Sequence, residues 1–119
     1  MFEYWMHTDL TGLPEVNRIQ GHGFTKDDGA NRIGVIITQA GEPAELEGSV
    51  SANIILPDKT TISVSGSMEG NRVWVALPDE AYDLAGKIRI FLKITGENST
   101  VTVGAAEGNV YQSMTSEVI

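Results

Sequence analysis

Apolar and polar residues alternate with a period of two along much of the chain, which is the spacing of a β-strand with one buried face. The clearest case is residues 87–94, where four aliphatic side chains share one face: Ile88, Ile90, Leu92 and Ile94. The opposite face carries Lys87, Arg89, Phe91 and Lys93. The same alternation predicts further inward faces: Ile33, Val35 and Ile37; Val50, Ala52, Ile54 and Leu56; Ile62 and Val64; Val73, Val75 and Leu77. The pattern predicts half-buried strands throughout.

Turn-forming residues separate these runs. They form the segments KDDGAN, AGEP, PDK, MEGN, PDEAY, GENS and EGN, which lie at 26–31, 40–43, 57–59, 68–71, 78–82, 96–99 and 107–109. Residues 79–84 can form one helical turn, because Pro78 can open it and two acidic residues suit its N-terminal end. We expect this turn to be a corner that takes the chain from one sheet to the other, with Tyr82 packed over it.

These elements predict an all-β fold, an antiparallel immunoglobulin-like β-sandwich of about seven to eight strands with an extended N-terminal arm. The count includes an early strand around residues 16–20 and two short strands within residues 100–113. The predicted divisions are an N-terminal arm at 1–15, the sandwich at 16–113, and a C-terminal tail or linker start at 114–119. A chain of 119 residues is long enough to form one such core.

Composition narrows the possible partners. Sixteen acidic residues against eight basic ones give a net charge of −8, which disfavours binding to a nucleic acid. The chain contains no cysteine, so disulfides, thiolate zinc sites and thiol catalysis are excluded. The N-terminal residues do not resemble a secretion signal, and no apolar run approaches the length of a membrane span. We therefore expect neither a nucleic-acid nor a membrane partner.

Candidate chemical groups are few. The only histidines are His7 and His22, and neither has the spacing of a known metal site. Asp27, Asp28 and Asn31 could offer oxygen ligands to calcium, but their spacing does not match an EF-hand loop, so a plain turn is favoured. The acidic residues at 42–47 are expected in a solvated loop or a protected edge strand. The sequence therefore predicts no enzyme, no metal site and no cofactor.

Apolar residues are instead concentrated where a partner could bind. Four of them lie within the first seven residues, and they form either a first strand folded onto its own domain or an arm that docks on a neighbouring subunit. Trp74 and Phe91 occupy the outward phase of their strands, where they either stiffen the sheet through a cross-strand contact or anchor an interface. The candidate interface residues are Phe2, Tyr4, Trp5, Met6, Trp74 and Phe91.

Three segments of the sequence, taken in this order, resemble a known protein family. They are the Asp28-Gly29 turn, the link at 41–50 and the segment at 70–93 with its LPDEAY corner. This order resembles the N-terminal, immunoglobulin-like domain of the siphophage baseplate upper protein family and related modules at the base of tail or head fibres. The resemblance covers residues 9–115. It implies no active site, and a role in attaching a fibre or receptor-binding protein to the virion in trimers or larger rings.

The predicted function is therefore that of a non-catalytic phage virion structural protein. It would assemble on the capsid or on the tail or baseplate, and it would connect to a fibre or receptor-binding component. The expected partners are other virion proteins and further copies of the chain, with a trimer favoured. The expected location is the virion, after synthesis in the bacterial host cytoplasm. The alternative is a carbohydrate- or ligand-binding β-sandwich module at a bacterial surface, with Trp74, Tyr82 and Tyr111 as stacking surfaces.

Overall fold

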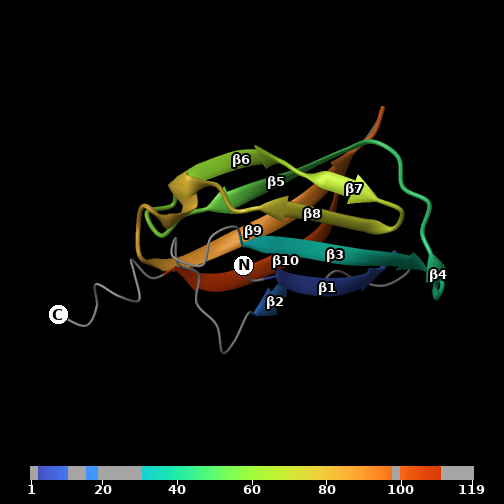
Figure 1. The fold of residues 1–119 in the computed structure, drawn as a ribbon, viewed down its shortest axis with the longest axis horizontal. Coiled ribbons are helices and arrows are strands. Elements are labelled where there is room, and N and C mark those ends of the chain that lie inside the picture. Colours follow the sequence, from blue (N-terminus) through green and yellow to red (C-terminus); the bar gives the residue numbers. More distant parts are fainter. Residues whose placement is uncertain (1–2, 11–15, 19–30, 98–99, 111–119) are drawn as a thin grey trace.

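Two β-sheets pack face to face in the computed structural model, which describes residues 3–10, 16–18, 31–97 and 100–110 (Figure 1). Strands make up most of the described residues, which confirms the prediction of an all-β sandwich. The described residues contain no helix that is long and apolar enough to cross a membrane. Their helical segment is η2, a short 3-10 helix at Asp79–Tyr82.

Each sheet contains five strands. Sheet A is ordered β1-β3-β8-β7, with β4 paired to the end of β3; its strands are β1 (Glu3–Asp9), β3 (Arg32–Gln39), β4 (Glu42–Pro43), β7 (Ser67–Glu69) and β8 (Arg72–Ala76). Sheet B is ordered β2-β10-β9-β5-β6; its strands are β2 (Val16–Arg18), β5 (Ser49–Ile55), β6 (Thr61–Ser65), β9 (Gly86–Thr95) and β10 (Thr100–Val110). Most neighbours are antiparallel, but β1 pairs with β3 and β2 pairs with β10 in parallel.

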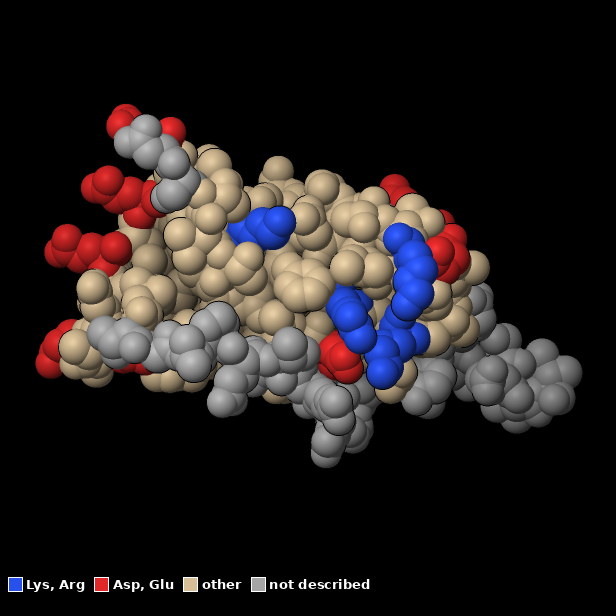
Figure 2. Space-filling model, turned by 180° about the vertical axis from the view of Figure 1, so that it is seen from behind, with Lys and Arg blue, Asp and Glu red and all other residues tan. Residues whose placement is uncertain are grey.

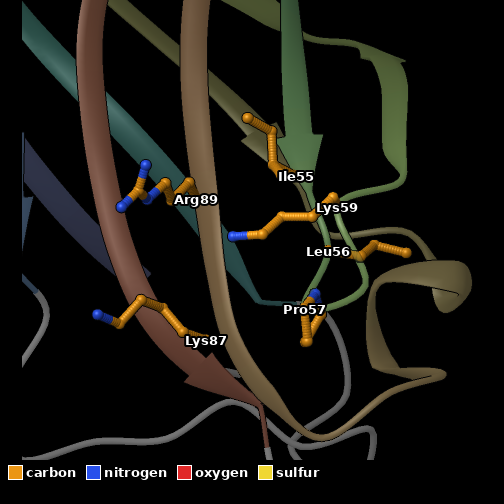
Figure 3. Close-up of a pocket in the computed structure, with 6 residues that line it drawn as sticks. All are labelled: Ile55, Leu56, Pro57, Lys59, Lys87 and Arg89. Carbon is orange, nitrogen blue, oxygen red and sulfur yellow. The ribbon is translucent and has the colours of Figure 1, made fainter.

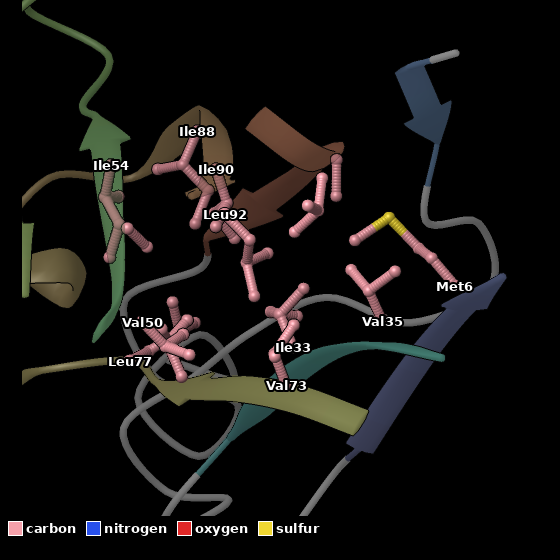
Figure 4. Close-up of a cluster of buried hydrophobic side chains, with 14 of the residues drawn as sticks. Met6, Ile33, Val35, Val50, Ile54, Val73, Leu77, Ile88, Ile90 and Leu92 are labelled. Atoms are coloured by element: carbon pink, nitrogen blue, oxygen red, sulfur yellow. The ribbon is translucent and has the colours of Figure 1, made fainter. Parts of the chain in front are cut away.

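The core between the sheets follows the predicted alternation (Figure 4). The predicted inward residues of β3, β5, β8 and β9, together with Leu56 and Leu77, are all buried. Ile62 and Val64 on the edge strand β6 are partly buried against this core. Each fully buried aliphatic side chain contributes about 1.5–3 kcal/mol, so this shared interior is the main source of stability.

Gly66 carries the chain from one sheet to the other. It alone separates β6, the edge of sheet B, from β7, the edge of sheet A. Its backbone N–H donates a hydrogen bond to the Val50 carbonyl oxygen over 2.8 Å. A Cβ atom at this position would lie 2.6 Å from the Trp74 carbonyl oxygen. The absence of a side chain therefore lets one nearly continuous strand close this side of the sandwich.

The LPDEAY segment forms the predicted corner. It links β8 in sheet A to β9 in sheet B, and η2 begins directly after Pro78. Ala81 and Tyr82 are the buried residues of this short helix. The Leu77 N–H donates to the Asn31 carbonyl oxygen over 2.9 Å, which ties the start of the corner to the segment that enters β3.

The prediction of two short strands within residues 100–113 was wrong. Residues 100–110 form one strand that pairs with β9 as far as Gly86, with a register shift between Thr102 and Gly104. The EGN segment at 107–109 lies inside this strand and is not a turn. Within this strand, Gly104 allows close packing, because a Cβ there would lie 2.5 Å from Val35 Cγ2. Residues 111–113 lie outside the described residues.

Residues 3–9 form a strand of the same domain. In β1, Glu3 pairs with Arg32 and Asp9 pairs with Thr38, and the Met6 side chain enters the core (Figure 4). Of the two alternatives for this segment, the structure has the strand folded onto its own domain. The early strand is present as β2, while residues 19–20 and most of the predicted turn at 26–31 lie outside the described residues. The predicted domain boundaries at 15 and 113 stay predictions.

Candidate interaction surface on sheet A

Two tryptophans from strands that are not neighbours meet on the outer face of sheet A. Trp5 on β1 pairs with Gly34 on β3, and Gly34 pairs in turn with Trp74 on β8. The two ring centroids lie 6.1 Å apart with an interplanar angle of 62°. This edge-to-face arrangement is one that aromatic pairs prefer, because the positive ring edge of one meets the negative ring face of the other.

Gly34 makes this contact possible. A Cβ atom at this position would lie 2.4 Å from Cζ3 of Trp5, so the Trp5 ring lies directly over the β3 backbone. Any larger residue at 34 would force the ring away from the sheet. The tryptophan pair thus depends on a glycine in the strand between its members.

Charged groups surround the pair. The Arg72 guanidinium carbon lies 5.9 Å from the centroid of the Trp5 ring, within the range of a cation–π interaction. On the other side, Trp5 Nε1 donates to Glu3 Oε1 over 3.4 Å, and Arg32 Nη1 donates to Glu3 Oε2 over 3.4 Å. These long, exposed contacts contribute little to stability. They do place a carboxylate and two guanidinium groups at the border of an aromatic surface.

A shallow hollow of about 430 Å³ lies at this place. It is lined by Glu3, Trp5, Arg32, Glu69, Gly70, Arg72 and Trp74. Tryptophan and arginine are the residues most enriched at energetically important contacts between proteins. The same side chains can also stack against a sugar ring and hydrogen-bond its hydroxyl groups. The hollow therefore suits a protein or carbohydrate partner.

The predicted interface residues do not all lie on one surface. Trp5 and Trp74 come together on the outer face of sheet A. Tyr4 is partly buried against the core and Met6 is only 2% exposed, so both belong to the interior side of β1. Phe2 lies outside the described residues. Phe91 lies in sheet B, paired with Asn53 on β5 and Ala105 on β10. The suggested contact between Trp74 and Phe91 was wrong, because their strands belong to different sheets.

No sequence pattern directly indicated the other residues in this surface. Arg72 shares the predicted outward phase of Trp74, but nothing in the sequence places it beside Trp5. No role for Gly34 was predicted from the sequence. Both become parts of the surface only because β1 pairs with β3 in parallel register.

The remaining candidates lie partly inside and partly outside the described residues. His7 is exposed on β1, and the described residues contain no group of three or more side chains suited to a metal ion. His22, Asp27 and Asp28 lie outside the described residues, while Asn31 is buried and hydrogen-bonded to Tyr82. Glu42, Glu45 and Glu47 are exposed. Tyr82 is only 6% exposed, so its suggested role as a stacking surface was wrong. Tyr111 lies outside the described residues.

Comparison with solved structures gives a fold relationship to a known domain. The sequence matches no family model, and no curated protein is similar to it. The fold resembles the N-terminal domain of phage TP901-1 ORF48. The two structures superpose with a TM-score of 0.52 and 14% sequence identity, over 95% of this chain and 100% of the other. At this level of identity the likeness shows a shared fold.

Proposed function

We propose that this protein is a non-catalytic structural component of a phage virion, which assembles on the capsid, tail or baseplate and connects it to a fibre or receptor-binding component. The observation that carries the proposal is the fold likeness to the N-terminal domain of a phage protein across 95% of this chain. The order of turns and strands at 28–29, 41–50 and 70–93, which resembles baseplate upper proteins, supports it independently of the fold comparison.

The Trp5–Trp74 surface supplies the means of assembly. The chain carries a net charge of −8, so copies repel one another at a distance and association must rest on a local surface. Trp5 and Trp74, with Arg72 against one ring, form a rigid aromatic group on a strand face. Such a group can anchor a neighbouring copy or another virion protein, and we favour a homo-oligomer, a trimer above all.

The test has two parts. Antibody against this protein should label particles of the phage or induced prophage that encodes it, at one end of the tail or on the head. Light scattering on the purified protein should give the mass of an oligomer that is stable on dilution, and the Trp74→Ala variant should shift that mass to a monomer. Phe91→Ala, an aromatic deletion on the opposite sheet, is the matched control and should leave the mass unchanged.

Circular dichroism of each variant shows that loss of assembly is not loss of folding. A wild-type chain that is a monomer at all concentrations and is missing from purified particles would rule the proposal out.

A carbohydrate-binding module is the second candidate, and the same two tryptophans support it. Their rings, with Glu3, Arg32 and Arg72 at the border, resemble in composition a platform on which a sugar ring stacks. A glycan array separates the two proposals. If the protein is a carbohydrate-binding module, it should bind saccharides, and this binding should be lost in Trp74→Ala and kept in Phe91→Ala. If it is a virion component, it should assemble whether or not it binds saccharides.

A further inference from the structure

Basic side chains gather on the outer face of sheet B. Lys87, Arg89 and Lys93 alternate along β9, and Lys59 lies in the turn between β5 and β6. Figure 2 views this face and shows the Lys and Arg side chains grouped on it, while most Asp and Glu side chains lie toward the two ends of the molecule. A protein with twice as many acidic as basic residues thus presents a local surface of the opposite sign.

Three of these cations line one hollow. It has a volume of about 380 Å³ and is lined by Ile55, Leu56, Pro57, Lys59, Lys87 and Arg89. Figure 3 shows Lys59 extending from its turn toward β9, while Lys87 and Arg89 extend from β9 toward β10. Residues 87 and 89 point to the same side of their strand because they are two positions apart. Ile55, Leu56 and Pro57 form an apolar side to the hollow, on which water competes less for the charged groups.

Glu107 on β10 lies beside two of the cations. Its carboxylate lies 3.7 Å from Lys87 Nζ and 3.7 Å from Arg89 Nε, and its side chain is only 11% exposed. The contact with Arg89 uses Nε, so the two terminal nitrogens of the guanidinium are left for a further ligand. Lys87 and Arg89 themselves are 61% and 55% exposed.

The balance of charge favours an anion. Three cations and one carboxylate leave two positive charges in excess at the hollow. Asp58, the neighbour of Lys59, does not line the hollow, and its carboxylate accepts the Thr60 N–H over 3.0 Å within its own turn. A phosphate group carries a charge of about −1.5 to −2 at neutral pH and three acceptor oxygens, which matches this excess. Arginine binds phosphate through paired hydrogen bonds, and lysine binds it as a point charge.

We propose that Lys59, Lys87 and Arg89 form a binding site for a phosphate group of a small molecule, with Glu107 positioning Lys87 and Arg89. This site lies in the opposite sheet from the Trp5–Trp74 surface and does not depend on the proposed virion role. A long nucleic acid does not suit it, because the net charge of −8 repels an extended phosphate backbone beyond the hollow.

Pyrophosphate titrated into the ¹⁵N-labelled protein at low salt tests the site. The backbone amide signals of Lys59, Lys87 and Arg89 should shift in a saturable way. Arg89→Gln should weaken binding by about tenfold or more, because it removes a charge-assisted hydrogen bond. Raising the salt from about 20 to about 200 mM should weaken binding further, since screening shortens the reach of these charges.

Lys93→Gln is the matched control. It removes the same charge from the same face of the same strand, but position 93 lies about 13 Å along β9 from position 89 and does not line the hollow. It should change the pyrophosphate affinity by less than about twofold. If Arg89→Gln and Lys93→Gln lost equal pyrophosphate affinity, the binding would be a general electrostatic attraction by this face, and the proposed site would be wrong. The lack of any saturable shift, or equally tight binding of a hexaglutamate peptide or a DNA duplex, would also overturn the site.

Discussion

Asn31 donates a hydrogen bond from Nδ2 to the hydroxyl oxygen of Tyr82 over 2.7 Å, between two buried side chains that lie 51 positions apart in the sequence. Asn31 is fully buried, and it also holds the corner through its carbonyl oxygen, which accepts the Leu77 N–H. The entry to β3 and the corner between the two sheets are therefore joined at one buried polar point.

Removal of the Tyr82 hydroxyl should destabilise the fold. Tyr82→Phe keeps the ring but removes the acceptor of the Asn31 amide, and we expect the free energy of unfolding to fall by about 1–3 kcal/mol. Urea denaturation followed by circular dichroism measures this. Tyr4→Phe, the same chemical change on β1, is the control and should cost less than about 0.5 kcal/mol. Equal effects of the two variants would show that the buried hydrogen bond contributes nothing particular.

The tryptophan pair should be sensitive to a single methyl group. Gly34→Ala places a carbon where the Trp5 ring lies, so it should reduce stability by about 1–3 kcal/mol and alter the near-ultraviolet circular dichroism of the two indoles. In a Trp5→Ala background the same substitution has no ring to displace. There Gly34→Ala should be close to neutral, and a cost that persists in that background would contradict the contact.

Substitution by alanine should destabilise the protein more at Gly66, where the chain crosses between the sheets, than at Gly70. At Gly66 a Cβ would collide with the Trp74 carbonyl oxygen and the Val50 side chain, so Gly66→Ala should cost about 3 kcal/mol. Gly70 has a φ of +60° but open space around it, so Gly70→Ala should cost only about 1 kcal/mol for the left-handed backbone. Thermal unfolding of the two variants provides the comparison, and an equal cost would show that the crossing at 66 has room to adjust.

Asp58 should titrate below the ordinary aspartate pKa of 3.8. The backbone N–H of Thr60 stabilises the carboxylate most, and the Thr60 hydroxyl adds to it, so both lower the pKa. A group with a lowered folded pKa contributes stability that is present above its unfolded pKa and is lost as the pH falls through the folded pKa. The stabilising effect of Asp58 should therefore begin to weaken as the pH falls below about 4 and should disappear below the folded pKa.

Carbon-detected NMR titration measures this pKa directly. Thr60→Ala should raise the pKa of Asp58 part of the way toward 3.8, because the hydroxyl is removed while the backbone N–H remains. A pKa unchanged by the substitution would show that the hydroxyl takes no part.

Much of the interior could be predicted from the sequence. Side chains on a strand alternate between its two faces, so the pattern in residues 87–94 alone identified Ile88, Ile90, Leu92 and Ile94 as buried. The corner at 78–82 was also predictable, because proline and acidic residues favour a helical turn locally. Local signals failed at residues 100–110, where the predicted turn at 107–109 lies inside one strand that pairs with β9.

The sequence by itself thus determined most of the side chains that lie inside, because alternation is a property of a single strand. Only the tertiary structure decided which outward side chains meet. Trp5 reaches Trp74 because β1 runs parallel to β3 across a glycine, and Phe91 is separated from both because its strand belongs to the other sheet. Lys59 joins Lys87 and Arg89 only through the pairing of β5 with β9. Strand order and register depend on contacts between distant segments, and no local pattern encodes them.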